Sequence, residues 1–427
     1  MTESAIQVHD GALLQKVIAD GARRVEIVGA ISGLRRLELP AGTHLSGADE
    51  RAGLAFEAGS AGLVLTADHE ISSLSLKTNP DQIAIGLTDT AQDLGKLTLR
   101  GLRVEGRVHL EAAHAQSGVL DLRDIHVSRA DARSATHLPA GFGVRVLAGG
   151  ITIYNRSTDT ASRWRLEANN LSGGSKDEPL RGSGVFIFGG STIPADVDPA
   201  TGPAPTTRGG SIELVALTTG EIHSDGGIVK GTPDRITGGV FIGAGVDAYA
   251  VVNRGPVSTY GVNDMVLDNW GRVRLWVADA PVTSYGDSGI GFVNFGDIEA
   301  LVVRGRVETH GGGARGYNLY DGTLDHAEFD SITTYGDGSM GVQLSKPFGR
   351  LVVHGDIRTK GGEGPSLVRG KVVTLKAHAL SLKPGTKGDA IFVLGQVVAE
   401  GSGIAAFEFV APASSVDLVM VNGAVVH

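Results

Sequence analysis

A repeat of 25 residues within the segment 246–372 constrains the fold more than any other feature of the sequence. Its units are short β-branched runs separated by glycine turns, which favours strands over helices. A fixed period of this size is typical of a solenoid, and three short strands with three turns fill about 25 residues. The sequence therefore predicts an all-β parallel β-helix. The repeating dipeptides are Tyr260-Gly261, Tyr285-Gly286, His310-Gly311, Tyr335-Gly336 and Lys360-Gly361.

Composition agrees with many tight turns and excludes several classes of function. Glycine accounts for 63 of 427 residues, about twice its ordinary share. The formal net charge of −9 argues against binding to nucleic acid or to an anionic membrane. The chain has no cysteine, so disulfides, thiol nucleophiles and cysteine-bound zinc are excluded. Without a visible signal peptide or long apolar run, we expect a cytoplasmic protein, export by another route remaining open.

The chain divides into a short cap and one long solenoid. Asp10 can cap a helix over residues 11–20, so residues 1–23 are predicted to cover the first rung. Residues 24–427 form the predicted β-helix, interrupted by a proline-rich loop at 191–210. No helix closes the far end. We expect there either a subunit contact in a homo-oligomer (trimer or dimer) or a loop folded over the last rung.

Alternation along the strands assigns side chains to the inside or the outside of the coil. One inward column is Val257, Val282, Val307, Ile332 and Ile357, and a second is Leu267, Phe292, Tyr317, Val342 and Leu367. Outward columns contain the aromatic residues of the repeat, continued by His223 and Asp225 one rung earlier. We expect these polar and aromatic side chains to converge on one long, shallow face.

These rungs resemble the right-handed parallel β-helix proteins of the pectate-lyase-like superfamily, as does the strand–turn–strand segment Leu39–Gly47. The resemblance is one of architecture and covers most of residues 24–427. It implies the activities found in that superfamily, which include polysaccharide lyases, glycoside hydrolases, inulin fructotransferases and epimerases. Phage tailspikes and autotransporter passengers share the same architecture.

The outward columns suggest carbohydrate chemistry. Rungs lie about 4.8 Å apart, close to the repeat of one sugar unit, and carboxylates among aromatic rings can act as general acid and base. We expect an enzyme that cleaves, transfers or cyclises a glycan, without cofactor or metal, using two carboxylates across an open cleft. The candidate catalytic residues are Asp268, Glu308, His310 and Asp321. The candidate substrate-binding residues are Tyr260, Trp270, Tyr285, Arg315, Asn318, Tyr320 and Tyr335.

A non-catalytic reading of the same residues stays open. The protein is then a structural, adhesin-like or glycan-binding solenoid, and the tyrosine column only stabilises the sheet by stacking. In that reading Asn269 and Asn294 form an interior amide ladder, and Asp264, Asp287 and Asp337 are turn residues. His223 and Asp225 are secondary site candidates, but no third ligand accompanies them.

Overall fold

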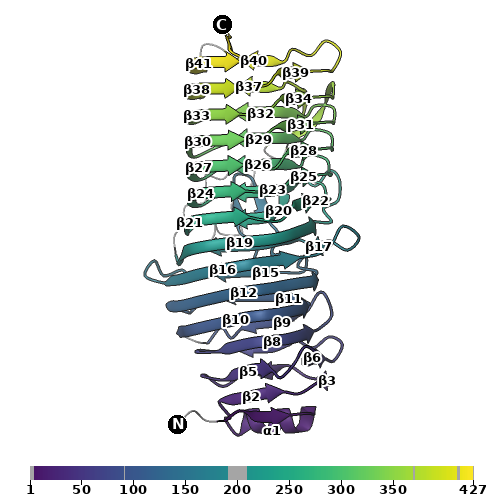
Figure 1. Ribbon diagram of the computed structural model, residues 1–427, viewed down its shortest axis with the longest axis vertical. Coiled ribbons are helices and arrows are strands. Elements are labelled where there is room, and N and C mark those ends of the chain that lie inside the picture. Colours follow the sequence, from purple (N-terminus) through teal and green to yellow (C-terminus); the bar gives the residue numbers. More distant parts are fainter. Residues whose placement is uncertain (1–3, 91, 191–208, 369–370, 411–413, 427) are drawn as a thin grey trace.

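The protein is a parallel β-solenoid, as the repeat predicts (Figure 1). The computed structural model describes residues 4–90, 92–190, 209–368, 371–410 and 414–426. Rungs stack along the long axis, with α1 at one end and β41 at the other. Most of the predicted 191–210 loop lies outside the described residues. Among the described residues, no helix is long and apolar enough to cross a membrane.

Two long sheets form the walls of the solenoid, a 25-stranded sheet A and a 15-stranded sheet B. Sheet A contains β1 (Ile6–Val8), β2 (Arg24–Ile27), β3 (Ala30–Leu34), β5 (His44–Gly47), β6 (Gly53–Phe56), β8 (Glu70–Lys77), β10 (Asp93–Glu105), β12 (Ser117–Arg129), β16 (Arg163–Gly173), β17 (Leu180–Arg181), β19 (Ser211–Asp225), β21 (Val246–Asn253), β22 (Val257–Thr259), β24 (Arg272–Ala278), β25 (Val282–Ser284), β27 (Asp297–Val303), β28 (Val307–Thr309), β30 (Thr323–Phe329), β31 (Ile332–Thr334), β33 (Pro347–Val353), β34 (Ile357–Thr359), β38 (Lys387–Val393), β39 (Val397–Ala399), β41 (Ser415–Val421) and β42 (Ala424–Val425). Sheet B contains β4 (Leu37–Glu38), β7 (Leu63–Leu65), β9 (Ile83–Leu87), β11 (Arg107–Ala112), β13 (Ala140–Gly141), β14 (Val144–Val146), β15 (Gly149–Asn155), β18 (Ser183–Gly189), β20 (Arg235–Ile242), β23 (Asp264–Asn269), β26 (Ile290–Asn294), β29 (Arg315–Leu319), β32 (Met340–Leu344), β37 (Leu380–Leu382) and β40 (Phe407–Phe409). A regular rung takes two strands from sheet A and one from sheet B.

The predicted cap helix is present as α1 (Gly11–Ala19). The Asp10 side chain accepts a hydrogen bond from the backbone N–H of Leu13 at 2.9 Å, which satisfies one of the free donors of the first turn. Leu14, Val17 and Ile18 are buried in the core of the solenoid. The helix therefore closes the apolar end of the first rungs (Figure 1).

The predicted register is confirmed through the regular rungs. Each inward valine or isoleucine pairs with its counterpart one rung later, from Val257 through Val282, Val307 and Ile332 to Ile357. All of these side chains are at most 1% exposed. The amide ladder is also present, because Asn269 Nδ2 donates to Asn294 Oδ1 at 2.8 Å.

The turn aspartates bind backbone N–H groups, as expected of turn residues. Asp287 Oδ1 accepts from the N–H of Gly312, and Asp337 Oδ1 does the same from Gly362. Asp264 differs because it is fully buried. It accepts from the Thr237 hydroxyl and from two backbone N–H groups, and burial raises its pKa to about 7.

The predicted second inward column is wrong at its last member. Val342 pairs with Leu380 and not with Leu367. Leu367 lies in an antiparallel hairpin of β35 (Glu363–Val368) and β36 (Lys371–Lys376), which is inserted between β34 and β37. The next partner of Ile357 is accordingly Val397, 40 residues later. Gly361 and Gly385 are 24 residues apart, which is close to the repeat, but the segment between them contains this hairpin.

The far end of the chain folds back on itself. β42 pairs antiparallel with β41, and the N–H of Val426 donates to the carbonyl of Val419 at 2.9 Å. A short segment therefore folds back onto β41, and a subunit contact at this end stays a prediction.

Replacing Val307 by Asp tests the register. An unpaired carboxylate would be buried in the inward column, so we expect the free energy of unfolding to fall by more than about 3 kcal/mol. Arg306→Asp, at the exposed neighbouring position, should change it by less than about 0.5 kcal/mol. Chemical denaturation of both variants measures the difference, and equal effects would contradict the inward placement of Val307.

Candidate functional site

The predicted site residues lie on two different surfaces. The first is a column at the ends of sheet A strands, here called the ring ladder: His223, Tyr260, Tyr285, His310, Tyr335 and Lys360. The second is the outer face of sheet B: Asp268, Trp270, Arg315, Asn318 and Tyr320, with Asp321 next to it. No ring contact between described residues joins the two sets. The single face expected from the sequence is therefore wrong, because β28 and β29 belong to different sheets.

The ring ladder is a continuous parallel stack. Tyr260 and Tyr285 have ring centroids 5.2 Å apart, Tyr285 and His310 5.0 Å, and His310 and Tyr335 4.5 Å. The planes of these pairs differ by at most 10°. Lys360 Nζ closes the stack 4.5 Å from the Tyr335 centroid. Each inner ring thus has both faces covered and presents only its edge to solvent.

The polar groups of the ladder are also engaged. His223 contacts the Tyr260 hydroxyl at 2.8 Å and Glu221 at 2.7 Å. The Tyr335 hydroxyl donates to Glu308 at 3.3 Å, and burial together with that carboxylate raises the pKa of Tyr335. Asp225 instead pairs with Arg181. Among the described residues, no group of three histidine or carboxylate side chains could hold a metal ion.

The outer face of sheet B is covered by inserted segments. Phe142, between β13 and β14, meets the Trp270 ring edge-on at 5.1 Å and the Phe295 ring at 4.4 Å. Trp270 is therefore only 5% exposed, so its ring is not the open binding surface that was expected. The repeat could not reveal this, because Phe142 lies far from Trp270 in the sequence.

Asp268 is enclosed as well. It is 0% exposed, and the Trp270 side chain favours its ionised form. Burial outweighs that interaction and raises the pKa of Asp268 well above its ordinary value. Asp321 forms an ion pair with Lys346 at 2.8 Å. The expected pair of carboxylates across an open cleft is thus wrong for Asp268.

A cavity of about 70 Å³ lies between the outer face of sheet B and the inserted segments. Asn318 is 1% exposed in its wall, and neither atom of its amide has a partner among the described residues. Arg315 is 3% exposed and donates to Gln343 Oε1 at 3.1 Å and to the carbonyl of Gly313 at 3.3 Å. Burial lowers its pKa to about 10, so it stays charged at neutral pH. The other lining residues are Phe142, Val144, Pro233, Ile236, Asn263, Met265, Ser288, Ile290, Phe295, Tyr320, Leu367 and Val368.

Backbone with positive φ borders this cavity. Phe142, Asn263 and Ser288 all line it and have φ of 52°, 59° and 57°, in the left-handed region that favours glycine. They are three of the eight non-glycine residues with positive φ among the described residues. Such conformations cost about 1–3 kcal/mol each.

Two open clefts flank the cavity. One, of about 820 Å³, shares Arg315, Tyr320 and Val368 with it and adds three lysines, Lys346, Lys383 and Lys387. The other, of about 520 Å³, is lined by Trp270, Phe295 and the acidic residues Asp247, Asp297 and Asp321. A ligand in the cavity therefore has room to extend on either side.

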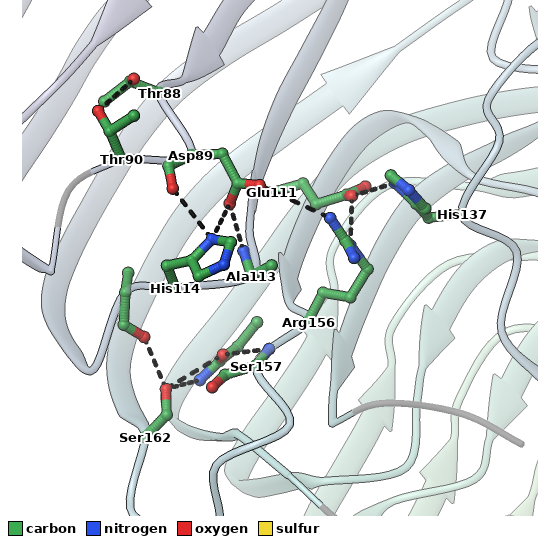
Figure 2. A network of polar contacts seen from close by, with 12 residues as sticks. Thr88, Asp89, Thr90, Glu111, Ala113, His114, His137, Arg156, Ser157 and Ser162 are labelled. Atoms are coloured by element: carbon green, nitrogen blue, oxygen red, sulfur yellow. Dashed lines mark hydrogen bonds and ion pairs between the residues drawn. The ribbon is translucent and has the colours of Figure 1, made fainter.

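Sequence reasoning missed a polar network farther toward the N-terminus (Figure 2). Glu111 on β11 accepts hydrogen bonds from His109 Nε2 at 3.0 Å and Arg156 Nε at 2.8 Å, and His137 Nδ1 lies 2.5 Å away. Burial works to raise the pKa of Glu111, but these donors outweigh it, so the pKa lies below its ordinary value. The only sequence signal was the alternation of His109 and Glu111.

Asp89 forms the second centre of this network. His114 Nδ1 lies 3.4 Å from one of its oxygens, and an Arg156 nitrogen lies 3.9 Å from the other. Arg156 thus stands between two carboxylates (Figure 2). The arrangement favours the ionised form of Glu111.

Tyr285→Ala tests the ring ladder. The change removes two ring pairs, worth about 0.5–1.5 kcal/mol each, so the free energy of unfolding should fall by about 1–3 kcal/mol. Tyr249→Ala is the matched control, since Tyr249 is 49% exposed against 46% for Tyr285 and contacts only the Arg274 side chain among the ring contacts described. Equal losses, measured by denaturation, would mean that stacking adds nothing.

Glu111→Gln tests the polar network by its pH dependence. A depressed carboxyl pKa adds stability above the unfolded-state pKa, and this is lost as the pH falls through the folded-state pKa. The variant should be less stable than wild type by at least about 2 kcal/mol at neutral pH, and the difference should shrink in acid. Glu50→Gln, at an exposed position, should show neither effect. Denaturation at a series of pH values measures both, and a constant difference would contradict this account.

No protein-family model, curated protein or solved structure matches the chain significantly. The function must therefore be argued from the site itself.

Proposed function

We propose that this protein binds a glycan on the outer face of sheet B, at the cavity beside Asn318 and in the adjoining clefts. The observation that carries the proposal is the Asn318 amide, which is 1% exposed and whose two polar atoms have no partner in the part of the chain that the structure describes. More than about 90% of buried polar groups in folded proteins have partners. An unpaired amide at a cavity wall is therefore best explained by a ligand that supplies them.

A sugar matches the chemistry of this wall. Hydroxyl groups both donate and accept hydrogen bonds, as the two ends of an amide require. The apolar faces of a sugar ring pack against aromatic side chains, and Phe295 and Tyr320 line the cavity with ring centroids 4.8 Å apart. Binding sites of this kind combine apolar walls with a few polar groups that fix orientation. The inner rings of the ladder, by contrast, have both faces covered.

A catalytic role is the second candidate, and the carboxyl groups of the smaller cleft favour it. Asp247, Asp297 and Asp321 line that cleft, whereas Asp268 is 0% exposed. Two carboxyl groups that face one cleft can serve as acid and base in glycosidic chemistry. In this proposal Asp297 and Asp321 act on a ligand in the cleft, and Asp268 takes no part. We also propose that the protein is a member of the pectate-lyase-like superfamily.

Glu308 and His310 take no part in this proposed reaction. They stand on β28 and in the turn after it, where Tyr335 binds Glu308 and the rings of Tyr285 and Tyr335 cover His310. We propose that they stabilise the ladder. Glu308→Gln should then leave turnover unchanged.

Asn318→Val tests the binding site with a substitution that the repeat itself supplies. Val293 occupies the same column one rung earlier, so the variant should fold normally. We expect affinity for the bound glycan to fall at least about 10-fold, as loss of hydrogen bonds worth about 1.4 kcal/mol requires. The measurement is a screen of neutral and acidic oligosaccharides by calorimetry, with product analysis.

Tyr249→Ala is the surface control and should bind like wild type. Undiminished binding by the Asn318→Val variant would place the site elsewhere. Product formation that survives both Asp297→Asn and Asp321→Asn would remove the catalytic proposal and leave the binding proposal standing.

A further inference from the structure

We infer that the cavity beside Asn318 is a carboxylate subsite, in which Arg315 binds an acidic group of the ligand. The inference deepens the proposed function and rests on it for the sugar part of the ligand, because it makes the glycan an acidic one. The carboxylate part rests on three separate features: the column that contains Arg315, the charge of Arg315 and the shape of the space around it.

The repeat shows that packing does not require an arginine here. Ile290 pairs with Arg315 across adjacent strands, and Arg315 pairs with Met340. Met265 occupies the same column one rung before Ile290. Three of the four positions are thus apolar, and methionine fills two of them. At this position the sheet accommodates an uncharged aliphatic side chain, and Arg315 is the one charged residue among the four.

The charge of Arg315 is uncompensated within the described part of the chain. Its two hydrogen bonds go to neutral oxygens, and no carboxylate forms an ion pair with it there. Removing a cation from water costs several kcal/mol unless an anion accompanies it. A guanidinium has five N–H groups in a planar fork, so three remain for a ligand. A carboxylate matches that fork with two parallel hydrogen bonds.

Asn318 complements the guanidinium. It lies three residues along the same strand, β29, and lines the same cavity with an amide that lacks partners. Its N–H₂ group can bind an oxygen of the acidic group or a neighbouring hydroxyl. The walls opposite are apolar and exclude water, which strengthens both interactions.

In this proposal one part of the ligand lies in the cavity and the rest lies in the larger cleft. A space of about 70 Å³ accommodates a carboxylate with a few further atoms, and the cleft of about 820 Å³ accommodates the rest. Arg315 and Tyr320 line both spaces, so the acidic group points inward while the body lies in the cleft.

The cleft also attracts anions. Lys346 and Lys383 are paired with Asp321 and Glu408, but Lys387 has no ion pair among the described residues. On a chain with a net charge of −9, this local excess of positive charge is distinctive. Such a field guides an acidic ligand toward Arg315.

Arg315→Met is the decisive variant, because the same column already contains methionine. We measure binding of D-glucuronate, D-glucose and benzoate by calorimetry, and melting temperature with and without each compound. Wild type should bind glucuronate more tightly than glucose. The variant should lose glucuronate affinity about 30-fold, which corresponds to about 2 kcal/mol, while its melting temperature stays the same or rises. Arg306→Met, at an exposed position, should behave as wild type.

The possible outcomes of this experiment distinguish a failure of the carboxylate subsite from a failure of the glycan proposal on which it rests. Binding of benzoate that depends on Arg315, without binding of any sugar, keeps the carboxylate subsite and overturns the glycan proposal. Equal binding of glucose and glucuronate keeps the glycan proposal and overturns the subsite. Absence of binding by either acid at millimolar concentration overturns the subsite. So does a melting temperature that falls in Arg315→Met with glucuronate binding unchanged, because the arginine is then structural.

Discussion

The parallel hydrogen-bonded ladder between rungs is the interaction on which the rest of the structure depends. It holds consecutive rungs about 4.8 Å apart and in register, so the neighbour of each side chain is its counterpart in the next rung. Val307 stacks between Val282 and Ile332 for this reason, and Asn269 finds its partner in Asn294. The ring ladder has the same origin, because 4.5–5.2 Å between its inner rings is the rung spacing set by the backbone.

This regularity makes each departure from a column informative. In most proteins a buried arginine has no internal reference for what packing alone would place there. Here Met265, Ile290 and Met340 supply that reference for Arg315. The column of Asn318 gives no such contrast, because Asp268 and Gln343 stand in it beside Val293. Arg315 lines the cavity together with three residues that have left-handed backbone conformations. One charged exception in an otherwise apolar column thus locates the proposed site more specifically than the aromatic residues do.

The sequence was sufficient for what depends on local period. The register of the inward valines and the amide ladder follow from short patterns that repeat at a fixed distance, and the cap helix follows from its N-cap residue Asp10. Insertions break that logic, since glycine spacing cannot distinguish a rung from a hairpin. Leu367 was misplaced for this reason. The burial of Trp270 and the grouping of Glu111 with His137 and Arg156 depend on segments distant in sequence, which no periodicity relates.

A stack of rungs by itself offers only a flat wall, and the inserted segments turn that wall into a site. The regular strands place Arg315, Asn318 and Tyr320 on the outer face of sheet B but leave them without an opposite wall. Phe142 from one insertion and Leu367 from another supply it, and they exclude water from the buried charge. The rungs thus supply the polar side chains of the proposed site, whereas the insertions supply the walls that enclose it. Because a rung cannot change length without losing its register, while an insertion can, the shape of the proposed site is set mainly by the inserted segments.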